Sequence, residues 1–174
     1  MSFIDLCKAR RSVRRYSDRP VEPEKLALIL EAGRMAPTGY NYQPQRVYVL
    51  ESAEARARLA GVTRMTFGAP LVLLVGYDIN ESWKNTPDTY GDDYDSGEMD
   101  ACIVGAQMMN MATDLGLGTL WARGFNAREV HDLFGLPENV RVAFFLDVGY
   151  PAEETRGLRR RSPRKPFAET VKVL

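Results

Sequence analysis

The feature that most constrains the fold is residues 97–115, which are apolar on nearly every side of a predicted helix. Alanine, cysteine, isoleucine, valine and methionine recur there at almost every position rather than along one stripe. An all-round apolar helix in a soluble chain is predicted to be buried centrally. We expect its methionines to pack in the core or in a subunit interface rather than to bind a metal.

The remaining apolar patterns predict four strands and four shorter helices around this helix. A length of 174 residues predicts one domain that spans residues 1–174. Ser2 and Ser52 are placed as N-caps, and Pro23 suits a first helical position. Strands are predicted at residues 46–50, 70–77, 119–122 and 140–150, and helices at 2–9, 23–36, 52–59 and 128–134.

Three segments have no regular pattern. Residues 37–44 contain two prolines and a glycine, which predicts a structured loop whose backbone amides face a ligand. Residues 78–96 are polar and acidic, and they predict either a mobile surface connection or a lid over a pocket. Residues 151–174 are rich in proline and arginine and lack a core pattern, so we expect them to lie on another surface.

The composition excludes several classes of protein. Lys plus Arg equals Asp plus Glu at 23 each, which argues against a nucleic-acid-binding protein. A single histidine argues against a zinc site, and the two cysteines are expected to stay reduced. No apolar run reaches the roughly 20 residues of a membrane span, and the N-terminus does not resemble a signal peptide, so we expect a cytoplasmic protein.

Residues 10–14, Arg-Arg-Ser-Val-Arg, concentrate cationic and hydroxyl donors near the N-terminus. Guanidinium groups match phosphate oxygens two bonds at a time, and Ser12 adds a neutral donor, so one interpretation is a phosphate site. The alternative is a solvated helix end whose arginines face the negative C-terminal dipole of the first helix. This stretch alone does not decide between them.

The chain contains no self-contained catalytic motif. The sequence has no dinucleotide-binding glycine loop, P-loop, nucleophile elbow or zinc-protease motif. His131 is expected to be a surface residue with no catalytic role. Reactive chemistry is therefore expected to come from a bound cofactor, with the protein supplying position and electrostatics.

Four motifs in order resemble the nitroreductase family. They are R-R-S-V-R-R-Y at residue 10, A-P-T-G-Y-N-Y-Q-P at residue 36, G-L-G-T-L-W-A-R-G-F at residue 116, and V-G-Y-P-A-E at residue 148 followed by P-R-K-P-F. The resemblance covers nearly the whole chain. It implies an α+β fold, with a central, mostly antiparallel sheet flanked by helices and a C-terminal tail that reaches the partner subunit of a homodimer.

The resemblance also implies FMN as cofactor and identifies candidate binding residues. Those matching the phosphate site are Arg10, Arg11, Ser12, Arg14 and Arg164. Those matching the loop on the flavin of the facing subunit are Pro37, Thr38, Gly39 and Asn41. Those matching the backbone near flavin N5 and O4 are Ala122, Arg123 and Gly124, and Arg64 resembles the cation near N1 and O2, which stabilises the reduced anionic flavin.

The implied activity is an oxidoreductase that takes hydride from NADH or NADPH onto flavin N5 and reduces a small organic acceptor, such as a nitroaromatic or a quinone, by a ping-pong mechanism. One alternative is a specialised dehalogenase or dehydrogenase of the same fold. Another is a non-enzymatic module that binds phosphate or nucleic acid. Gly39 stands where the family often has a second serine, Gln45 where tryptophan is common, and Ser162 where a basic residue is frequent, which bears mainly on substrate choice.

Overall fold

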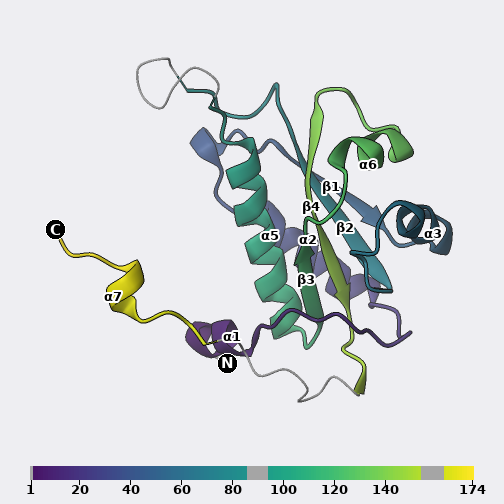
Figure 1. Ribbon diagram of the computed structural model, residues 1–174, viewed down its shortest axis with the longest axis horizontal. Coiled ribbons are helices and arrows are strands. Elements are labelled where there is room, and N and C mark those ends of the chain that lie inside the picture. The colour runs from purple at the N-terminus through teal and green to yellow at the C-terminus, as the bar shows by residue number, and fades with distance from the viewer. Residues whose placement is uncertain (1, 86–93, 154–162) are drawn as a thin grey trace.

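A four-stranded antiparallel sheet forms the centre of the molecule. The computed structural model describes residues 2–85, 94–153 and 163–174. Within them, the sheet has the order β1-β2-β4-β3, and every neighbouring pair is antiparallel (Figure 1). The strands are β1 (Gln45–Leu50), β2 (Leu71–Asp78), β3 (Gly118–Ala122) and β4 (Val140–Gly149). The fold is α+β, as the motifs implied.

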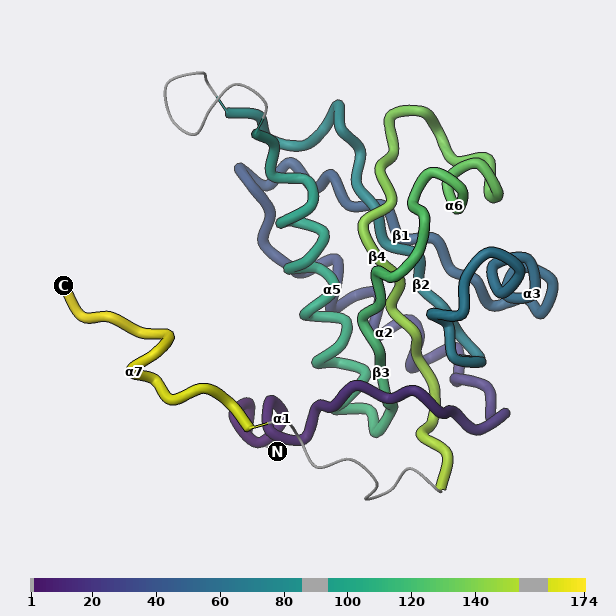
Figure 2. Tube along the Cα trace, in the orientation of Figure 1, coloured from purple at the N-terminus to yellow at the C-terminus, as the bar shows by residue number. Residues whose placement is uncertain are grey.

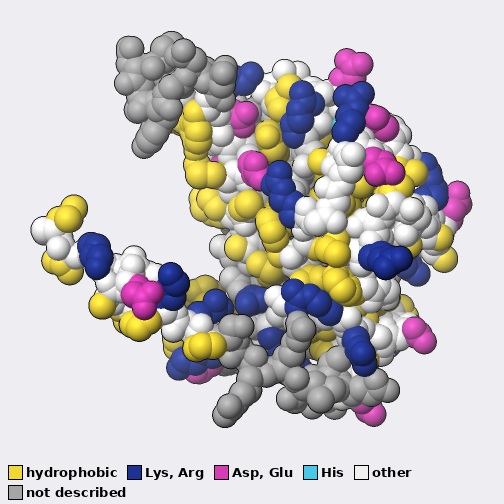
Figure 3. Space-filling model, in the orientation of Figure 1, with side chains coloured by type: hydrophobic (Ala, Val, Ile, Leu, Met, Phe, Trp, Pro, Cys, Tyr) yellow, Lys and Arg dark blue, Asp and Glu magenta, His cyan; other side chains and the backbone are white. Residues whose placement is uncertain are grey.

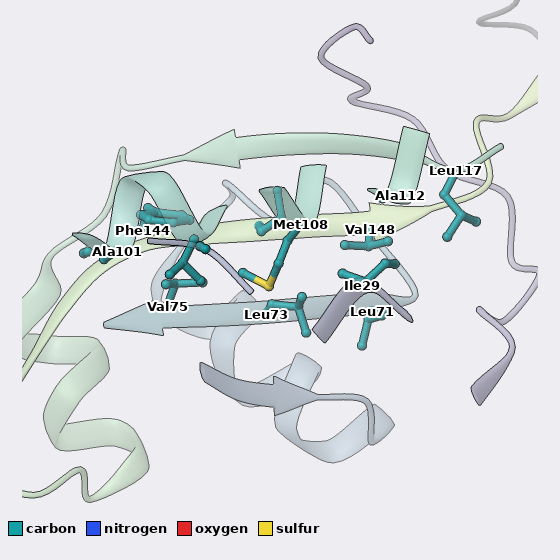
Figure 4. Packing of buried hydrophobic residues seen from close by; sticks show 14 of the residues in the cluster. Ile29, Leu71, Leu73, Val75, Ala101, Met108, Ala112, Leu117, Phe144 and Val148 are labelled. Carbon is teal, nitrogen blue, oxygen red and sulfur yellow. The ribbon is translucent and has the colours of Figure 1, made fainter. Parts of the chain in front are cut away.

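Helices cover both faces of this sheet. On one face, α2 and α5 pack against a core that includes Leu73, Phe144 and Met108 (Figure 4). On the other face, α3 and α6 supply Leu59 and Val130 to a second core. The helices are α1 (Phe3–Ala9), α2 (Pro23–Arg34), α3 (Ala53–Val62), α5 (Gly97–Asp114), α6 (Ala127–Phe134) and α7 (Phe167–Thr170), with a 3₁₀ turn, η1, at Gly39–Asn41.

Local sequence signals account for these elements. Ser2 and Ser52 accept backbone N–H bonds at the starts of α1 and α3, and Pro23 opens α2. The strand β2 is buried on both faces, consistent with its continuous apolar run. The predicted elements are confirmed, with ends that differ by one to three residues, because helix and strand ends are weakly specified by sequence.

Within the single chain, the central burial predicted for this apolar helix holds for one side of α5 only. One side of α5 packs on the sheet and on α2, where Val104 and Met108 are fully buried. The opposite side leaves Met99 and Ile103 exposed, at 54% and 41% of their full surface. A side chain of this size gains about 1.5–3 kcal/mol when fully buried, so this uncovered side is suited to contact with another surface.

The two ends of the chain lie on the same side of the molecule. Residues 163–174 extend away from the sheet as an arm that carries α7 (Figure 2). Every described residue of this arm is exposed, including Phe167 and Val173. An exposed arm with apolar side chains agrees with the expectation that the tail needs a second surface. Across the described ranges, no helix is long and apolar enough to cross a membrane.

Candidate functional site

The arginine-rich residues after α1 form an extended strip along the edge of the sheet. The Val13 N–H donates to the Thr119 carbonyl at 2.9 Å, and Ser12 pairs with Thr119 in a parallel bridge. Val13 is buried, whereas Ser12 and Arg14 are exposed. Successive side chains of an extended segment point to opposite sides, so Ser12 and Arg14 share the side that faces solvent.

Two of the cations around this strip lack a carboxylate partner in the described part of the chain. Arg14 and Arg64 form no ion pair with any residue in the described ranges, although Arg34, Arg46 and Arg128 each bond to a carboxylate at 2.6–3.1 Å. Figure 3 shows basic side chains gathered along the lower part of this face. Unpaired guanidinium groups beside an exposed serine hydroxyl are the donor set that binds a phosphate.

The helix-dipole alternative accounts poorly for the strip. Arg10 caps the C-terminus of α1, and Lys8 already lies in the last turn of that seven-residue helix. From Arg10 onward the backbone is extended, so Ser12 and Arg14 lie beyond the last turn. Because the field of a helix dipole falls off within that turn, it does not explain a cation at position 14.

A tight turn between α3 and β2 carries Arg64 to the same region. The Arg14 guanidinium carbon lies 5.9 Å from the centre of the Phe67 ring. Phe67 holds a left-handed φ of 47°, which is rare for a bulky residue and occurs mainly at constrained sites. In the same turn, Met65 packs so closely on Gly124 that a Cβ there would lie 2.9 Å from the Met65 sulfur. The fold thus groups the turn with Arg14 and Gly124.

Two consecutive backbone amides lack acceptors just after β3. Ala122 is the buried last residue of the strand, and the Arg123 carbonyl accepts from the Phe125 N–H at 2.9 Å in a tight turn. Within the described part of the chain, the N–H groups of Arg123 and Gly124 have no hydrogen-bond acceptor. The side chain of Arg123 forms an ion pair with Glu98 at the start of α5. Adjacent amides of this kind can donate to an electronegative ligand atom.

The loop at residues 37–44 is irregular, as predicted, and is held against α5. The Gly39 N–H donates to Asp100 Oδ1 at 2.9 Å, and the Thr38 hydroxyl accepts from the Gln43 N–H at 3.1 Å. Tyr40, Asn41 and Gln43 all have left-handed φ angles, of 49°, 58° and 53°. Pro37 and Asn41 are exposed. Three such residues in so short a segment indicate a conformation imposed by function or packing.

The loop and the strip lie on opposite flanks of α5 within one chain. The loop bonds to Asp100, whereas Arg123 bonds to Glu98. Two residues correspond to about 200° around a helix axis, so Glu98 and Asp100 point to nearly opposite sides. The single chain therefore groups Ser12, Arg14, Arg64, Arg123 and Gly124, but not the residues of the 37–41 loop. Arg164 is exposed at the beginning of the C-terminal arm.

The described ends of residues 78–96 form the base of a hairpin. Lys84 pairs with Asp95 in an antiparallel bridge, and the Asn85 N–H donates to the Tyr94 carbonyl at 3.1 Å. The prediction of a lid or a surface connection falls mainly on residues 86–93, which lie outside the described residues. A lid over a pocket and a mobile surface connection therefore both stay predictions for this segment.

Sequence reasoning missed a buried carboxyl behind the strip. Asp147 on β4 is fully buried, and neither of its oxygens has a hydrogen-bond partner among the described residues. A Cβ added to Gly149, on the same face of β4, would lie 3.0 Å from the Tyr16 ring, whose hydroxyl donates to the Val13 carbonyl at 2.9 Å. Burial raises the pKa of Asp147 to about 8. Burial first, and then the Asp147 charge, raise the pKa of Tyr16, which stays neutral.

Comparison with known proteins agrees with this geometry. The model of the nitroreductase family matches residues 7–67 and 62–150. The chain belongs to the nitroreductase family. A nitroreductase family protein from Clostridium difficile 630 is 35% identical, with a TM-score of 0.86, over 99% of this chain and 98% of that one.

Two other relatives bear on the cofactor and the electron donor. A provisionally named nitroreductase from Desulfovibrio desulfuricans was solved in complex with FMN; it is 29% identical, with a TM-score of 0.81, over 98% of this chain and 95% of that one. A protein of Caulobacter sp. (strain K31), provisionally named NADH dehydrogenase/NAD(P)H nitroreductase, is 28% identical over 91% of this chain and 89% of its own. Membership of the nitroreductase family accounts for the antiparallel sheet and its flanking helices.

The environment of His131 differs from the predicted surface position. Its side chain is only 14% exposed, and Nε2 lies 3.0 Å from the Pro137 carbonyl. It is on α6, and within the described part of the chain the hydrogen bonds of its ring are with Asp132 and Pro137, on α6 and just after it. We therefore retain the expectation that it has no catalytic role.

Replacing His131 with alanine is expected to leave turnover within about threefold of wild type, because the contacts it loses are structural. Steady-state rates with NADH and a nitroaromatic acceptor measure this directly. A thousandfold loss would identify His131 as an acid or base and contradict the expectation. Asp132→Ala, which removes the neighbouring side chain that contacts His131 Nδ1, is the matched control.

Proposed function

We propose that the protein is an FMN-dependent oxidoreductase that takes electrons from NADH or NADPH and reduces a small organic acceptor. The observation that carries the proposal is the grouping of unpaired Arg14 and Arg64 with Ser12 and with the free amides of Arg123 and Gly124. An anionic cofactor with a polar ring edge needs both kinds of donor. The complex of a relative with FMN supports the choice of that cofactor.

The residues present fit FMN in distinct roles. Arg10, Ser12 and Arg14 would hold the phosphate, because alternate positions of an extended strip present their side chains on one side. The amides of Arg123 and Gly124 would donate to the ring edge, and Arg64 would stabilise negative charge on it. When bound, FMN supplies the redox chemistry by accepting hydride from the nicotinamide and passing electrons to the acceptor.

We propose further that the functional unit is a homodimer. The 37–41 loop and the strip lie on opposite flanks of α5, so a second copy would bring the loop of one chain to the strip of the other. Between the flanks, α5 exposes Met99 and Ile103, a surface suited to a partner. The arm at residues 163–174, which carries Arg164, would extend onto that partner.

Absorption spectroscopy of the purified protein is the first test. We expect flavin bands in the visible region, which bleach when NADH or NADPH is added without oxygen and return when a quinone or nitroaromatic is supplied. Sedimentation is expected to give a dimer with one flavin per chain. A protein that neither retains nor rebinds flavin would contradict the proposal and favour a phosphate-binding module. Bound flavin that neither nicotinamide reduces would favour a specialised member of the fold.

A further inference from the structure

A buried hydrogen-bond network on α5 fixes the loop that contains Gly39. Asp100 is 3% exposed and accepts two bonds, from the Gly39 N–H at 2.9 Å and from the Ser96 hydroxyl at 2.6 Å. Ser96 is 4% exposed, and its hydroxyl accepts from the Trp83 N–H at 3.2 Å. The Ser96 N–H donates back to the Trp83 carbonyl at 2.9 Å. One carboxylate thus joins the 37–44 loop to both sides of the hairpin base.

The close approach of Gly39 depends on its lack of a side chain. A Cβ at this position would lie 3.0 Å from Ser96 Oγ and 3.2 Å from Trp83 Cβ, which is tighter than ordinary packing. The next residue, Tyr40, stacks on the Trp83 ring with centroids 6.0 Å apart and planes 19° apart. The glycine that departs from the family pattern therefore allows the loop to dock on Ser96 and Trp83.

From this network we infer that Asp100 is a positioning residue that sets the shape of the 37–41 loop where it covers the flavin bound by the partner chain. The inference rests on the proposed function. Without the Asp100 carboxylate, the partly buried Gly39 amide would have no acceptor, and left-handed Tyr40 and Asn41 would lose the anchor that holds them. Asp100 acts through the loop and touches no reacting group itself.

Hydrogen exchange at Gly39 tests the link without relying on activity. Asp100→Ala is expected to speed exchange of the Gly39 amide and to weaken FMN binding about tenfold, because a buried charge-assisted bond is lost. Alanine favours the helix, so α5 is expected to persist. Asp100→Asn keeps an acceptor for Gly39 and is expected to restore protection. Ser96→Ala removes only one of the two bonds to Asp100. It is therefore expected to speed Gly39 exchange less than Asp100→Ala does and to weaken FMN binding about threefold.

Asp78 provides a matched control. It is also buried, at 6% exposed, and accepts bonds from Arg46 and Asn139 at 3.1 and 2.7 Å. Among the described residues its side chain makes no hydrogen bond to Gly39, and it reaches the far end of the loop only through Arg46, which donates to the Gln43 and Pro44 carbonyls. Asp78→Ala is expected to lower stability while leaving the Gly39 amide protected. Unchanged Gly39 exchange and unchanged FMN affinity in both Asp100→Ala and Ser96→Ala would overturn the inference. Wild type that binds no flavin would instead contradict the proposed function.

A mixed dimer tests whether the loop acts on the partner. One chain carries Arg14→Ala with Asp100→Ala, and the other is wild type, so action across the dimer places one defect in each site. Putting Arg14→Ala in one chain and Asp100→Ala in the other instead places both defects in one site and leaves the second intact. That arrangement is expected to bind one FMN per dimer with wild-type affinity. Two weakened sites, with neither at wild-type affinity, would place the loop on the flavin of its own chain and overturn the inference.

Discussion

Replacing Asp147 with asparagine is expected to remove a large pH dependence from the stability of the protein. Burial raises the folded-state pKa of Asp147 from 3.8 to about 8, so the folded protein binds this proton more tightly than the unfolded chain does. The corresponding stability is fully present below about pH 4 and is lost as the pH rises through 8. Asparagine has nearly the same shape and cannot ionise.

The expected magnitude follows from the size of that shift. Each pKa unit corresponds to about 1.4 kcal/mol, so the free energy of unfolding of Asp147→Asn minus that of wild type should grow by about 5 kcal/mol between pH 4 and pH 8. Urea titrations at several pH values measure this difference. If it stays constant across that range, Asp147 has an ordinary pKa and a hydrogen-bond partner in solution.

Asp132→Asn is the control with the opposite sign. The pKa of this exposed carboxyl is lowered, first by the hydrogen bond from His131 and then by that from Arg128. Its contribution to stability is present above the unfolded-state pKa and is lost as the pH falls through the folded-state value. The difference in free energy of unfolding between Asp132→Asn and wild type should therefore change with pH only in the acid range, and it should not grow toward pH 8.

The sequence predicted the parts of the site that are local in the chain. Ser12 and Arg14 are two residues apart, and side chains two residues apart in an extended segment point to the same side. Their shared side is therefore predicted from the sequence alone. The free amides of Arg123 and Gly124 come directly after β3, a strand that the sequence of residues 119–122 predicts. The roles of these positions came from the family motifs, since spacing alone left the helix-dipole interpretation open.

The missed residues depend on contacts between distant segments. Asp100 belongs to an acidic stretch whose composition predicts exposure to solvent. It is buried because the loop at Gly39, 61 positions earlier in the chain, packs on α5. Asp147 lies in an apolar strand, but no local pattern indicates that both oxygens lack a partner. The apolar composition of α5 predicts that Met99 is buried. It does not distinguish burial inside one chain from burial against a partner chain, and within the single chain Met99 is exposed.

Replacing Arg14 with alanine is expected to weaken FMN binding about tenfold to a hundredfold. Charge-assisted bonds to a phosphate contribute roughly 1.5–3 kcal/mol each, and Arg14 has no competing carboxylate in the described part of the chain. Riboflavin lacks the phosphate, so its affinity is expected to be nearly the same in wild type and Arg14→Ala. Fluorescence titration of both flavins into apo protein measures the two affinities.

Arg128→Ala removes the same charge from α6, where the guanidinium is paired with Asp132, and is expected to leave both affinities unchanged. Equal losses for FMN and riboflavin in Arg14→Ala would mean that this side chain shapes the pocket, through its contact with Phe67, without binding phosphate. No loss for either ligand, with a stability change of at most about 1 kcal/mol, would restore the helix-dipole interpretation. Only a loss confined to FMN identifies the strip as a phosphate site, because only the phosphate distinguishes the two ligands.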